Sequence, residues 1–434
     1  MRLEPVIVGL LFAFASTAAT NPSAVTFAKD VAPILQNNCQ GCHRPGEAAP
    51  FSLLTYEQAR PWAKAMKEAV LLKKMPPWFA DPHYGKFSND RSLPQKEIDT
   101  LIAWSDAGAP QGDPKDMPPP ASFVEGWRIP KPDVVFEMPN PFEVPAAGTI
   151  EYQYIVVPSG FTGDKWVRFS EARPGNRQLV HHIIAFIREP DSKWLKDAKP
   201  GVPFVPKKNK DGEKDEGGRA GDFLAGYAPG TMPVELTPGQ AKLVKAGSDI
   251  VFQMHYTANG HAGNDQSKVG IVFATEPPKE RVFTLAAGKG DFKIPPGDPN
   301  YKVDSEFEMG TQVKLVGMLP HMHLRGKDFE YRVVYPTGER ETILSVPHYS
   351  FSWQLSYYPV KPIVLTKGTK IECTAHYDNS PNNPSNPDAT KEVTWGDQSW
   401  DEMMLGFFDV AFDAKMPLKN LFPEKKDEKK AGGD

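Results

Sequence analysis

A C-x-x-C-H pattern is the first group of residues in this chain whose types and spacing could do chemistry. It consists of Cys39, Cys42 and His43, and this spacing is typical of c-type haem attachment. The two thiols add across the two vinyl groups of one haem, and the adjacent histidine then lies under the iron as an axial ligand. The sequence has no second cysteine pair for zinc and no βαβ pattern for a thioredoxin-like motif. The pattern therefore predicts one covalently bound haem c.

The sixth iron ligand is expected to be a methionine on the other side of the haem. Met75 is the best candidate, because two prolines follow it directly and stiffen the loop that holds its thioether. The alternative is that Met75 is only a core residue. Met66 falls on the apolar stripe of a predicted helix, and Met117 lies in a Pro-rich stretch. Ligation of the iron by His43 and Met75 would raise the reduction potential of the haem, which suits electron transfer.

Five other histidines fall in three strand-like segments: His181 and His182, then His255, then His321 and His323. Residues i and i+2 of a strand face the same way, so His321 and His323 are spaced to bind one metal ion together. His181 and His182 point to opposite faces of a flat strand. They share an ion only if the strand has a local bulge or the two side chains differ in reach. A third histidine from another strand would complete a three-imidazole site.

A thioether near His321 and His323 would decide which metal binds. Imidazole suits copper, zinc, iron and nickel, whereas a thioether selects Cu(I). The segment 401–405 offers Met403 or Met404. These residues together favour copper, and the alternative is that all of them are structural.

The other histidines and the third cysteine are expected to be structural. His83, His261 and His348 are typical of surface or loop positions. His376 alternates with Cys373 in a strand-like run, so it is interpreted as structural or as support for a ligand. Cys373 has no partner and is expected to be a buried thiol, which leaves the protein free of disulfides.

The segments that must position these residues change character along the chain. Residues 24–110 have a helical pattern, with an apolar stripe at Ala59, Trp62, Ala63, Met66 and Val70. Residues 111–145 are rich in proline and predict an extended linker. From residue 146 the apolar period is two, which predicts strands over 150–157, 179–187, 249–256, 312–318, 329–335, 369–377 and 403–412. About 270 residues of short strands favour two antiparallel β-sandwiches, at 146–283 and 284–415, with a break near 277–297.

Both ends of the chain and its overall charge restrict where the protein acts. Residues 1–19 have the pattern of a secretory signal peptide, with an apolar run too short to span a bilayer. Residues 423–434 predict a charged, solvated tail. The net charge of −4 gives no electrostatic reason to bind nucleic acid. We expect an exported protein, periplasmic or secreted, without stable membrane insertion.

The order of the histidine motifs resembles that of a known family. His-His, Gln-Met-His-Tyr, His-Met-His-Leu-Arg-Gly-Lys and Asp-Glu-Met, over residues 146–412, resemble the copper type II ascorbate-dependent monooxygenases. These include peptidylglycine α-hydroxylating monooxygenase and dopamine β-monooxygenase. The resemblance implies two sandwich domains with one copper each, across a solvent-filled cleft. It implies an electron-storing site at His181, His182 and His255, and a catalytic, oxygen-activating site at His321, His323 and Met403.

Residues 24–110 as a whole resemble a cytochrome c domain. The predicted fold is therefore multidomain, with a small all-α cytochrome c domain followed by two antiparallel β-sandwich domains. Three departures from the monooxygenase family concern its substrate-binding residues. Leu319, Leu405 and Phe407 stand where the peptide-amidating enzyme has an arginine, an asparagine and a tyrosine. Peptide amidation is therefore not expected, and the substrate is expected to be less polar.

The sequence leads to one functional hypothesis and two alternatives. The hypothesis is a copper-dependent monooxygenase that uses O₂ to hydroxylate a C–H bond of a small organic substrate. Its electrons would come from ascorbate or a redox protein, and would reach the first copper site through the haem. The first alternative is a haem and copper electron-transfer protein without catalysis. The second is a β-sandwich binding module that carries a cytochrome.

Overall fold

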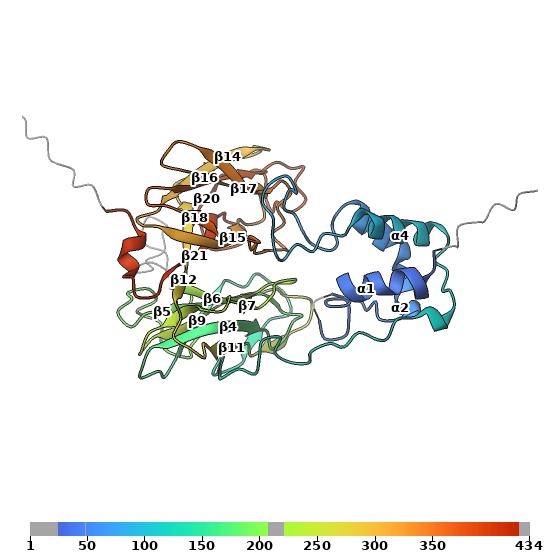
Figure 1. The fold of residues 1–434 in the computed structure, drawn as a ribbon, viewed down its shortest axis with the longest axis horizontal. Helices are drawn as coiled ribbons and strands as arrows, with labels where there is room; N and C mark the ends of the chain where they lie inside the picture. Colours follow the sequence, from blue (N-terminus) through green and yellow to red (C-terminus); the bar gives the residue numbers. More distant parts are fainter. Residues whose placement is uncertain (1–24, 48, 207–220, 425–434) are drawn as a thin grey trace, which may run out of the picture.

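The computed structural model describes residues 25–47, 49–206 and 221–424. The expected signal peptide at 1–19 and residues 425–434 of the expected charged tail lie outside the described residues. In Figure 1 the blue N-terminal helices lie at one end of the molecule, and two β layers lie one above the other beside them.

The helices are short and come early in the chain. They are η1 (Phe27–Val31), α1 (Ala32–Asn38), α2 (Tyr56–Ala59), η2 (Arg60–Trp62), α3 (Ala63–Leu71), α4 (Gln95–Asp106), η3 (Pro114–Asp116) and, near the other end of the chain, η4 (Leu418–Leu421). Thr55 caps α2 by accepting the N–H of Gln58, whose side chain in turn accepts the N–H of Leu54. The helices share a small core around Phe27, Leu35 and Trp104.

The prediction of a small all-α cytochrome c domain over 24–110 is wrong. Strand makes up 35% of the structure and helix only 12%. The chain between α3 and α4 leaves the helices and joins the second β layer, where Trp78 and Phe87 lie in the apolar core. The amide of Ser88 donates to Tyr358 O at 2.8 Å, and the amide of Val360 donates to Lys86 O at 2.8 Å. The segment between α3 and α4 is irregular and has no helical periodicity, because its hydrogen-bond partners are backbone groups of strands and loops.

One long twisted sheet runs through both β layers. Its strands lie in the order β1 (Val134–Glu137), β11 (Lys268–Phe273), β4 (Lys165–Arg173), β8 (Gln240–Val244), β12 (Glu280–Lys289), β21 (Met404–Asp413), β15 (Val313–His321) and β18 (Ile363–Leu365), with β7 (Val234–Glu235) on β4. Neighbours are antiparallel except β8 and β12, which pair in parallel at Glu280 with Gln240 and Arg281 with Ala241. The sheet is therefore continuous from one layer to the other.

Two four-stranded sheets cover the halves of the long sheet. The first has the order β3 (Gln153–Pro158), β9 (Asp249–Tyr256), β5 (Val180–Arg188) and β6 (Asp222–Tyr227), and the second has the order β14 (Tyr301–Glu308), β19 (Lys370–Tyr377), β16 (Gly326–Val334) and β17 (Arg340–Val346). Two small pairs complete the fold: β2 (Phe142–Val144) with β10 (Gly263–Asp265), and β13 (Lys293–Ile294) with β20 (Val393–Thr394).

Each pair of sheets encloses its own apolar core. Ile155, Ile183 and Phe252 are fully buried in the first core, and Leu315, Tyr331 and Phe408 in the second. This β-rich part is compatible with two antiparallel sandwiches. β1 and β2 lie inside the stretch 111–145 that was expected to be a linker, and β1 pairs with β11. The sheet structure thus begins at Val134 rather than at residue 146.

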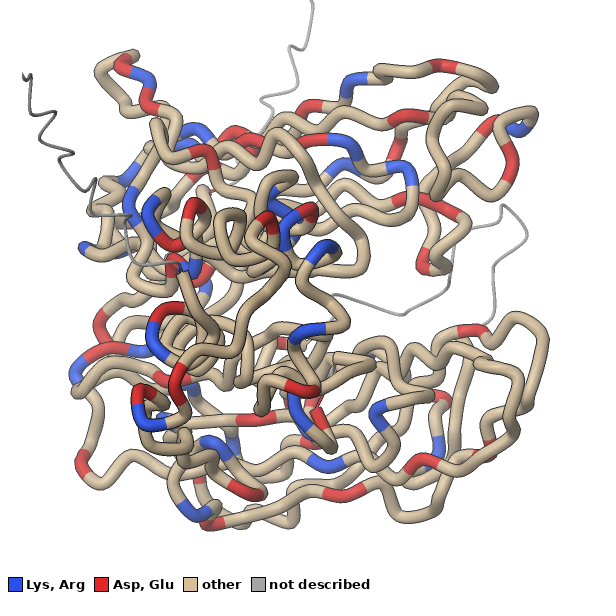
Figure 2. Tube along the Cα trace, turned by 90° about the vertical axis from the view of Figure 1, so that its right-hand side faces the viewer, with Lys and Arg blue, Asp and Glu red and all other residues tan. Residues whose placement is uncertain are grey.

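The surface gives no sign of a strongly charged face or a membrane span. Figure 2 shows lysine and arginine interspersed with aspartate and glutamate around the molecule. Within the described ranges, none of the helices is long and apolar enough to cross a bilayer.

Candidate metal centre

The first histidine group consists of His181, His182 and His255. His182 of β5 lies directly opposite His255 of β9 in the strand register. The register shifts between Val180 and His182, so His181 is the extra residue of a bulge. The bulge allows both adjacent histidines to reach the same place, and one nitrogen from each of the three side chains lies within 4.8 Å of the others.

The imidazoles of the first histidine group are neutral and have nitrogens without hydrogen-bond partners. Burial lowers the pKa of His181 to about 4 and that of His255 to about 3. Burial lowers the pKa of His182 well below its usual value, and the neighbouring His255 and His181 oppose its protonation further. His181 Nδ1, His255 Nδ1 and both nitrogens of His182 are buried without a partner in the part of the chain described. Because an unpaired buried nitrogen is costly, these lone pairs fit a metal ion.

The second histidine group consists of His321 and His323 on the chain that leaves β15. Their ring centroids are 5.2 Å apart, as expected for residues i and i+2. His321 Nδ1 lies 2.7 Å from Gln354 Oε1, and His323 Nδ1 lies 3.2 Å from the carbonyl of Asp401. Both contacts are to acceptors, so Nδ1 carries the proton and Nε2 keeps its lone pair. His323 Nε2 is buried and has no partner among the described residues.

Glu402 joins the second histidine group to the Asp-Glu-Met segment. It is fully buried and accepts the backbone N–H of His323 at 2.8 Å and that of Arg325 at 2.7 Å. Burial raises the pKa of this carboxyl to about 8. The motif therefore has a structural basis, since its glutamate fixes the backbone on which His323 stands.

Of the two candidate methionines, Met403 is the one on the side of His321. Met403 and His321 line the same cavity between the two sandwiches. Met404 instead points into the second apolar core, where its sulfur accepts the hydroxyl of Ser305 at 3.1 Å. The alternation along β21 therefore favours Met403 as a ligand.

Phe351, on the loop between β17 and β18, touches both histidine groups. Its ring is stacked on His181 with centroids 5.1 Å apart and lies 5.8 Å from the ring of His323. Ser399 Oγ lies 3.4 Å from His255 Nε2, so a second loop of the C-terminal sandwich also reaches the first group. The two groups thus belong to one centre.

The C-x-x-C-H residues lie in the turn that follows α1. Cys39 caps the helix, and the amide of Cys42 donates to its carbonyl at 3.1 Å. Burial raises the pKa of Cys39 to about 12 and also raises that of Cys42, so both are neutral free thiols. His43 Nδ1 lies 3.3 Å from Phe51 O, which leaves Nε2 for a ligand. Two thiols and a free imidazole nitrogen on one turn fit covalent haem attachment.

Met75 follows the turn that ends α3. Its amide donates to Ala69 O at 3.3 Å, and its side chain is half-buried. No hydrogen bond or ring contact joins it to the C-x-x-C-H turn within the described ranges, so its role as the sixth ligand stays a prediction. Met66 packs on the helical core beside Cys39, in agreement with its expected packing role.

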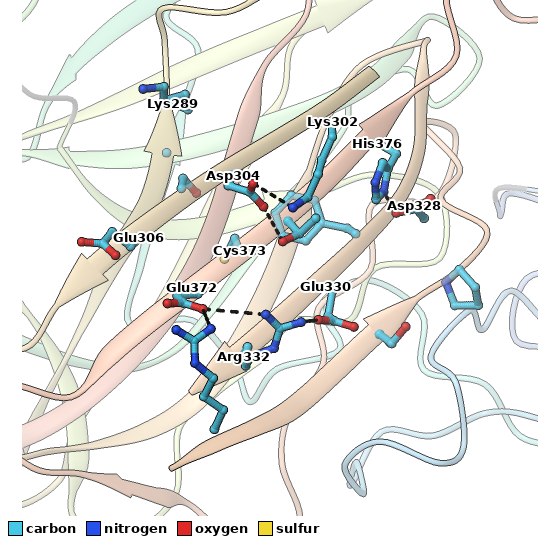
Figure 3. A pocket seen from close by; sticks show the side chains of 17 residues that line it. Lys289, Lys302, Asp304, Glu306, Asp328, Glu330, Arg332, Glu372, Cys373 and His376 are labelled. Carbon is cyan, nitrogen blue, oxygen red and sulfur yellow. Dashed lines mark hydrogen bonds and ion pairs between the residues drawn. The ribbon is translucent and has the colours of Figure 1, made fainter. Parts of the chain in front are cut away.

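A separate cavity of about 890 Å³ lies on the outer face of the second four-stranded sheet (Figure 3). Its charged side chains are matched across the strands, as in Arg332 with Glu372 at 3.8 Å and Lys370 with Glu306 at 2.8 Å. His376 lies here, 2.6 Å from Asp328 Oδ1, and Cys373 is buried beneath. This is a sheet face with paired charges, where His376 lies beside Asp328 and apart from both histidine groups.

Four residues of the centre were missed by sequence reasoning. Gln354, Phe351 and Ser399 lie on loops, where no periodic signal marks them. Tyr152 has its ring centroid 4.6 Å from His255 and 5.0 Å from His182, and it lies just before β3. Only the fold brings these residues to the histidines.

Comparisons with known proteins add nothing on identity. No protein-family model and no curated protein matches the chain. Among solved structures, the chain is similar to infectious bursal disease virus, Gx strain, at 10% identity and a TM-score of 0.19, covering 70% of this chain and 77% of that one. It is also similar to allantoicase at 8% identity and a TM-score of 0.16, covering 55% and 79%. A tandem CBM22 domain of Paenibacillus barcinonensis Xyn10C follows at 9% identity and a TM-score of 0.12, covering 60% and 77%. Scores this low carry no argument about fold or function.

Proposed function

We propose that this protein is a copper-dependent monooxygenase that hydroxylates a C–H bond of a small organic substrate with O₂. Its electrons would come from ascorbate or a redox protein through a covalently bound c-type haem. In the overall reaction the C–H bond becomes C–OH, while the second oxygen atom takes two electrons and two protons and leaves as water. When bound, two copper ions would supply O₂ activation and one-electron chemistry.

The observation that carries this proposal is the set of buried imidazole nitrogens without partners in the two histidine groups. An isolated buried nitrogen of this kind costs about 1–3 kcal/mol, and the described part of the chain has five. They are His181 Nδ1, His182 Nδ1, His182 Nε2, His255 Nδ1 and His323 Nε2. A metal ion at each group would bind one nitrogen of each histidine and so remove this cost for four of the five.

The residues around the second histidine group prepare it for a metal. Gln354 and the carbonyl of Asp401 accept from the Nδ1 atoms, which leaves each Nε2 lone pair for a ligand. Glu402 fixes the backbone of His323. Met403 lines the same cavity as His321 and would add a thioether, which favours Cu(I) over zinc. The first histidine group has no thioether candidate from the resemblance, consistent with an electron-storing role.

The cavity beside His321 supports an apolar substrate. It has a volume of about 320 Å³, and Leu319, Leu405 and Phe407 all line it. These are the three positions at which the sequence departs from the peptide-amidating enzyme. Their apolar side chains exclude water from the substrate side of the metal site.

The contact between the N-terminal segment and the sandwiches supports the haem as an electron donor. A small cavity of about 60 Å³ has Trp78, Arg91 and His182 in its wall. Arg91 also donates to Gly230 O at 2.9 Å. His182 of the first histidine group therefore lines the same small cavity as Trp78 and Arg91, which belong to the segment between α3 and α4.

Metal analysis of the copper-loaded, haem-loaded protein tests the proposal. We expect two copper ions and one haem iron per chain, and one copper ion in the variant His323→Ala. The matched control His376→Ala removes a histidine from the same sandwich and keeps two copper ions. Met403→Ala is expected to keep both ions at high copper and to weaken one of them at low copper.

Oxygen uptake then separates catalysis from electron transfer. Turnover of a substrate with one oxygen atom incorporated supports the monooxygenase, and its loss in His323→Ala assigns the site. Two bound copper ions without product formation in a broad substrate screen would favour the electron-transfer alternative. A copper count near zero would overturn the proposal.

A further inference from the structure

The floor of the cavity between the sandwiches is a ladder of three rungs. Leu405, Phe407 and Asp409 of β21 line the cavity in turn, whereas Met404 before them and Phe408 between them are buried in the second apolar core. The registers give the rungs as Gly288–Leu405–His321, Ala286–Phe407–Leu319 and Thr284–Asp409–Gly317. The second and third rungs each have a small residue beside a larger one, Ala286 beside Phe407 and Gly317 beside Asp409, and these small residues leave room for the cavity.

The ladder makes the cavity long and narrow. The first and last rungs are four residues apart on β21, which corresponds to about 14 Å along a strand. A volume of about 320 Å³ along that length has room for an extended chain. The opposite wall includes Ile184, Phe186 and Phe223 from the first four-stranded sheet, together with Gln253 and Tyr154, whose polar atoms are hydrogen-bonded to each other at 2.7 Å.

The two ends of the cavity differ in chemistry. One end carries His321 and Met403, which belong to the proposed oxygen-activating site. The other end carries Lys242, Thr284, Asp409 and Tyr358. Lys242 is 1% exposed and donates to Asp222 Oδ1 at 3.2 Å and to Thr284 Oγ1 at 3.1 Å. This ammonium is therefore already matched by the carboxylate of Asp222.

Asp409 offers the polar end an acceptor that faces the cavity. Thr284 Oγ1 donates to its Oδ1, and Lys242 Nζ lies 3.9 Å from that oxygen. A Cβ placed on Gly317 would lie 3.2 Å from Asp409 Oδ2 and 3.3 Å from the ring of Tyr358. Both contacts would be tight, so a glycine at 317 leaves Oδ2 uncovered on this side, where a larger residue would crowd it. The next cation, Arg281, lies beside Asp222 and 3.9 Å from Glu189, and Glu189 is also paired with Lys245 at 2.7 Å. The buried charges are therefore matched, and Asp409, whose side chain is 24% exposed, is the carboxylate that reaches the cavity.

We infer that this cavity binds an extended aliphatic molecule with a hydrogen-bond-donating end group, an alcohol or an amine. The end group would donate to Asp409, and the far end of the chain would lie beside His321 and Met403. The inference rests on the proposed function for what happens to the ligand, but its binding does not need copper. The oxidised carbon would then be the one remote from the polar group.

Calorimetric titration of the full-length, metal-free protein tests the inference with four probes of defined chemistry. Decan-1-ol and decylamine are expected to bind, and decanoate is expected to bind at least tenfold more weakly because its carboxylate meets Asp409. Octan-1-ol is expected to bind about sixteenfold more weakly than decan-1-ol, at about fourfold for each buried methylene. Equal binding of decanoate and decylamine, or no dependence on chain length, would overturn the inference.

Two variants check where the probes bind. Ala286→Leu fills the middle rung and is expected to remove binding of all probes, whereas the matched control Ala103→Leu, on the exposed side of α4, binds like the parent. Asp409→Asn is expected to weaken decylamine at least tenfold and to leave decan-1-ol within about threefold. A thermal melt of each variant shows that the protein is folded. Unchanged binding by the Ala286→Leu variant contradicts the inference.

The outcome is separable from that of the proposed function. Two bound copper ions and oxygen uptake without alkanol or amine binding would leave the monooxygenase standing and remove this substrate class. Binding with the expected selectivity in a protein that takes up no copper would keep the ligand site and remove the monooxygenase.

Discussion

The ring of Phe351 is stacked on the ring of His181, with centroids 5.1 Å apart and planes inclined by only 14°. The same ring lies 5.8 Å from that of His323. A residue of the second sandwich therefore positions a histidine of the first, and one aromatic side chain sets how the two histidine groups meet.

Replacing Phe351 should loosen the contact between the two histidine groups. We expect Phe351→Ala to lower the free energy of unfolding by roughly 2–3 kcal/mol, less than for a fully buried ring, because Phe351 is half-buried. Phe351→Leu should cost roughly 1 kcal/mol, since it keeps most of the apolar contact and loses only the ring stacking. Urea denaturation of the metal-free protein measures both. A loss near zero for Phe351→Leu would show that stacking on His181 does not matter.

Gln354 is expected to affect copper affinity at the second histidine group only. Gln354→Leu removes the acceptor for His321 Nδ1–H at 2.7 Å, so the imidazole loses its fixed orientation. We expect copper affinity at that group to fall about 10–100-fold, with the first histidine group unchanged. Copper titration of single-site variants measures each affinity. Gln240→Leu, far from the centre, is the control, and a similar drop in that variant would point to a general loss of structure.

Asn89 attaches the chain between α3 and α4 to the second sandwich. Its side chain donates to Ser356 O at 2.7 Å and accepts the amide of Tyr358 at 3.1 Å, so it replaces a strand partner. Asn89→Ala should cost about 2 kcal/mol and increase amide hydrogen exchange at 356–360. Asn259→Ala, at an exposed hydrogen bond, should leave exchange there unchanged. Protection at 356–360 that survives Asn89→Ala would contradict this attachment.

Acid should destabilise the metal-free protein through the first histidine group. Burial lowers the pKa of His181 to about 4 and that of His255 to about 3, below the value of about 6.5 in an unfolded chain. Between about pH 6.5 and 4 the unfolded chain binds protons that the native state does not, so the free energy of unfolding falls as pH falls. Urea midpoints across this range measure the effect.

Two further measurements check this assignment of the acid response. His181→Gln should flatten the pH dependence of the urea midpoint. Added copper, which binds only the native site, should raise the midpoint at pH 6.5. A midpoint independent of pH between 4 and 6.5 would show that these histidines are accessible to protons in the native state.

The strands that sequence reasoning found are those with a clean alternation of apolar and polar residues. The segments 150–157, 179–187, 249–256 and 369–377 correspond to β3, β5, β9 and β19. The strand β12 was missed and lies inside the stretch interpreted as a break. Its residues Ala286 and Gly288 carry little apolar signal, because they are small for a packing reason: a Cβ on Gly288 would lie 2.7 Å from Leu405.

The candidate site was predictable as far as its histidines. Spacing paired His321 with His323, whereas the family resemblance grouped His255 with His181 and His182. Strand geometry required either a bulge or unequal side-chain reach at His181 and His182, and the structure has the bulge. The loop residues Phe351, Gln354 and Ser399 were not predictable, since hydrogen bonds between segments far apart in the chain place them. The all-α domain was predicted wrongly because the chain 72–94 has partners in the second sandwich that no local pattern records.

The parallel pairing of β8 with β12 restricts how the two halves of the protein can move relative to each other. Hinged halves open by rotating about a flexible connection, but here backbone hydrogen bonds carry the sheet across from one half to the other. A clamshell motion would have to break that sheet. The spacing between the two histidine groups is therefore set when the chain folds, and molecules must enter by side-chain and loop movement rather than by domain closure.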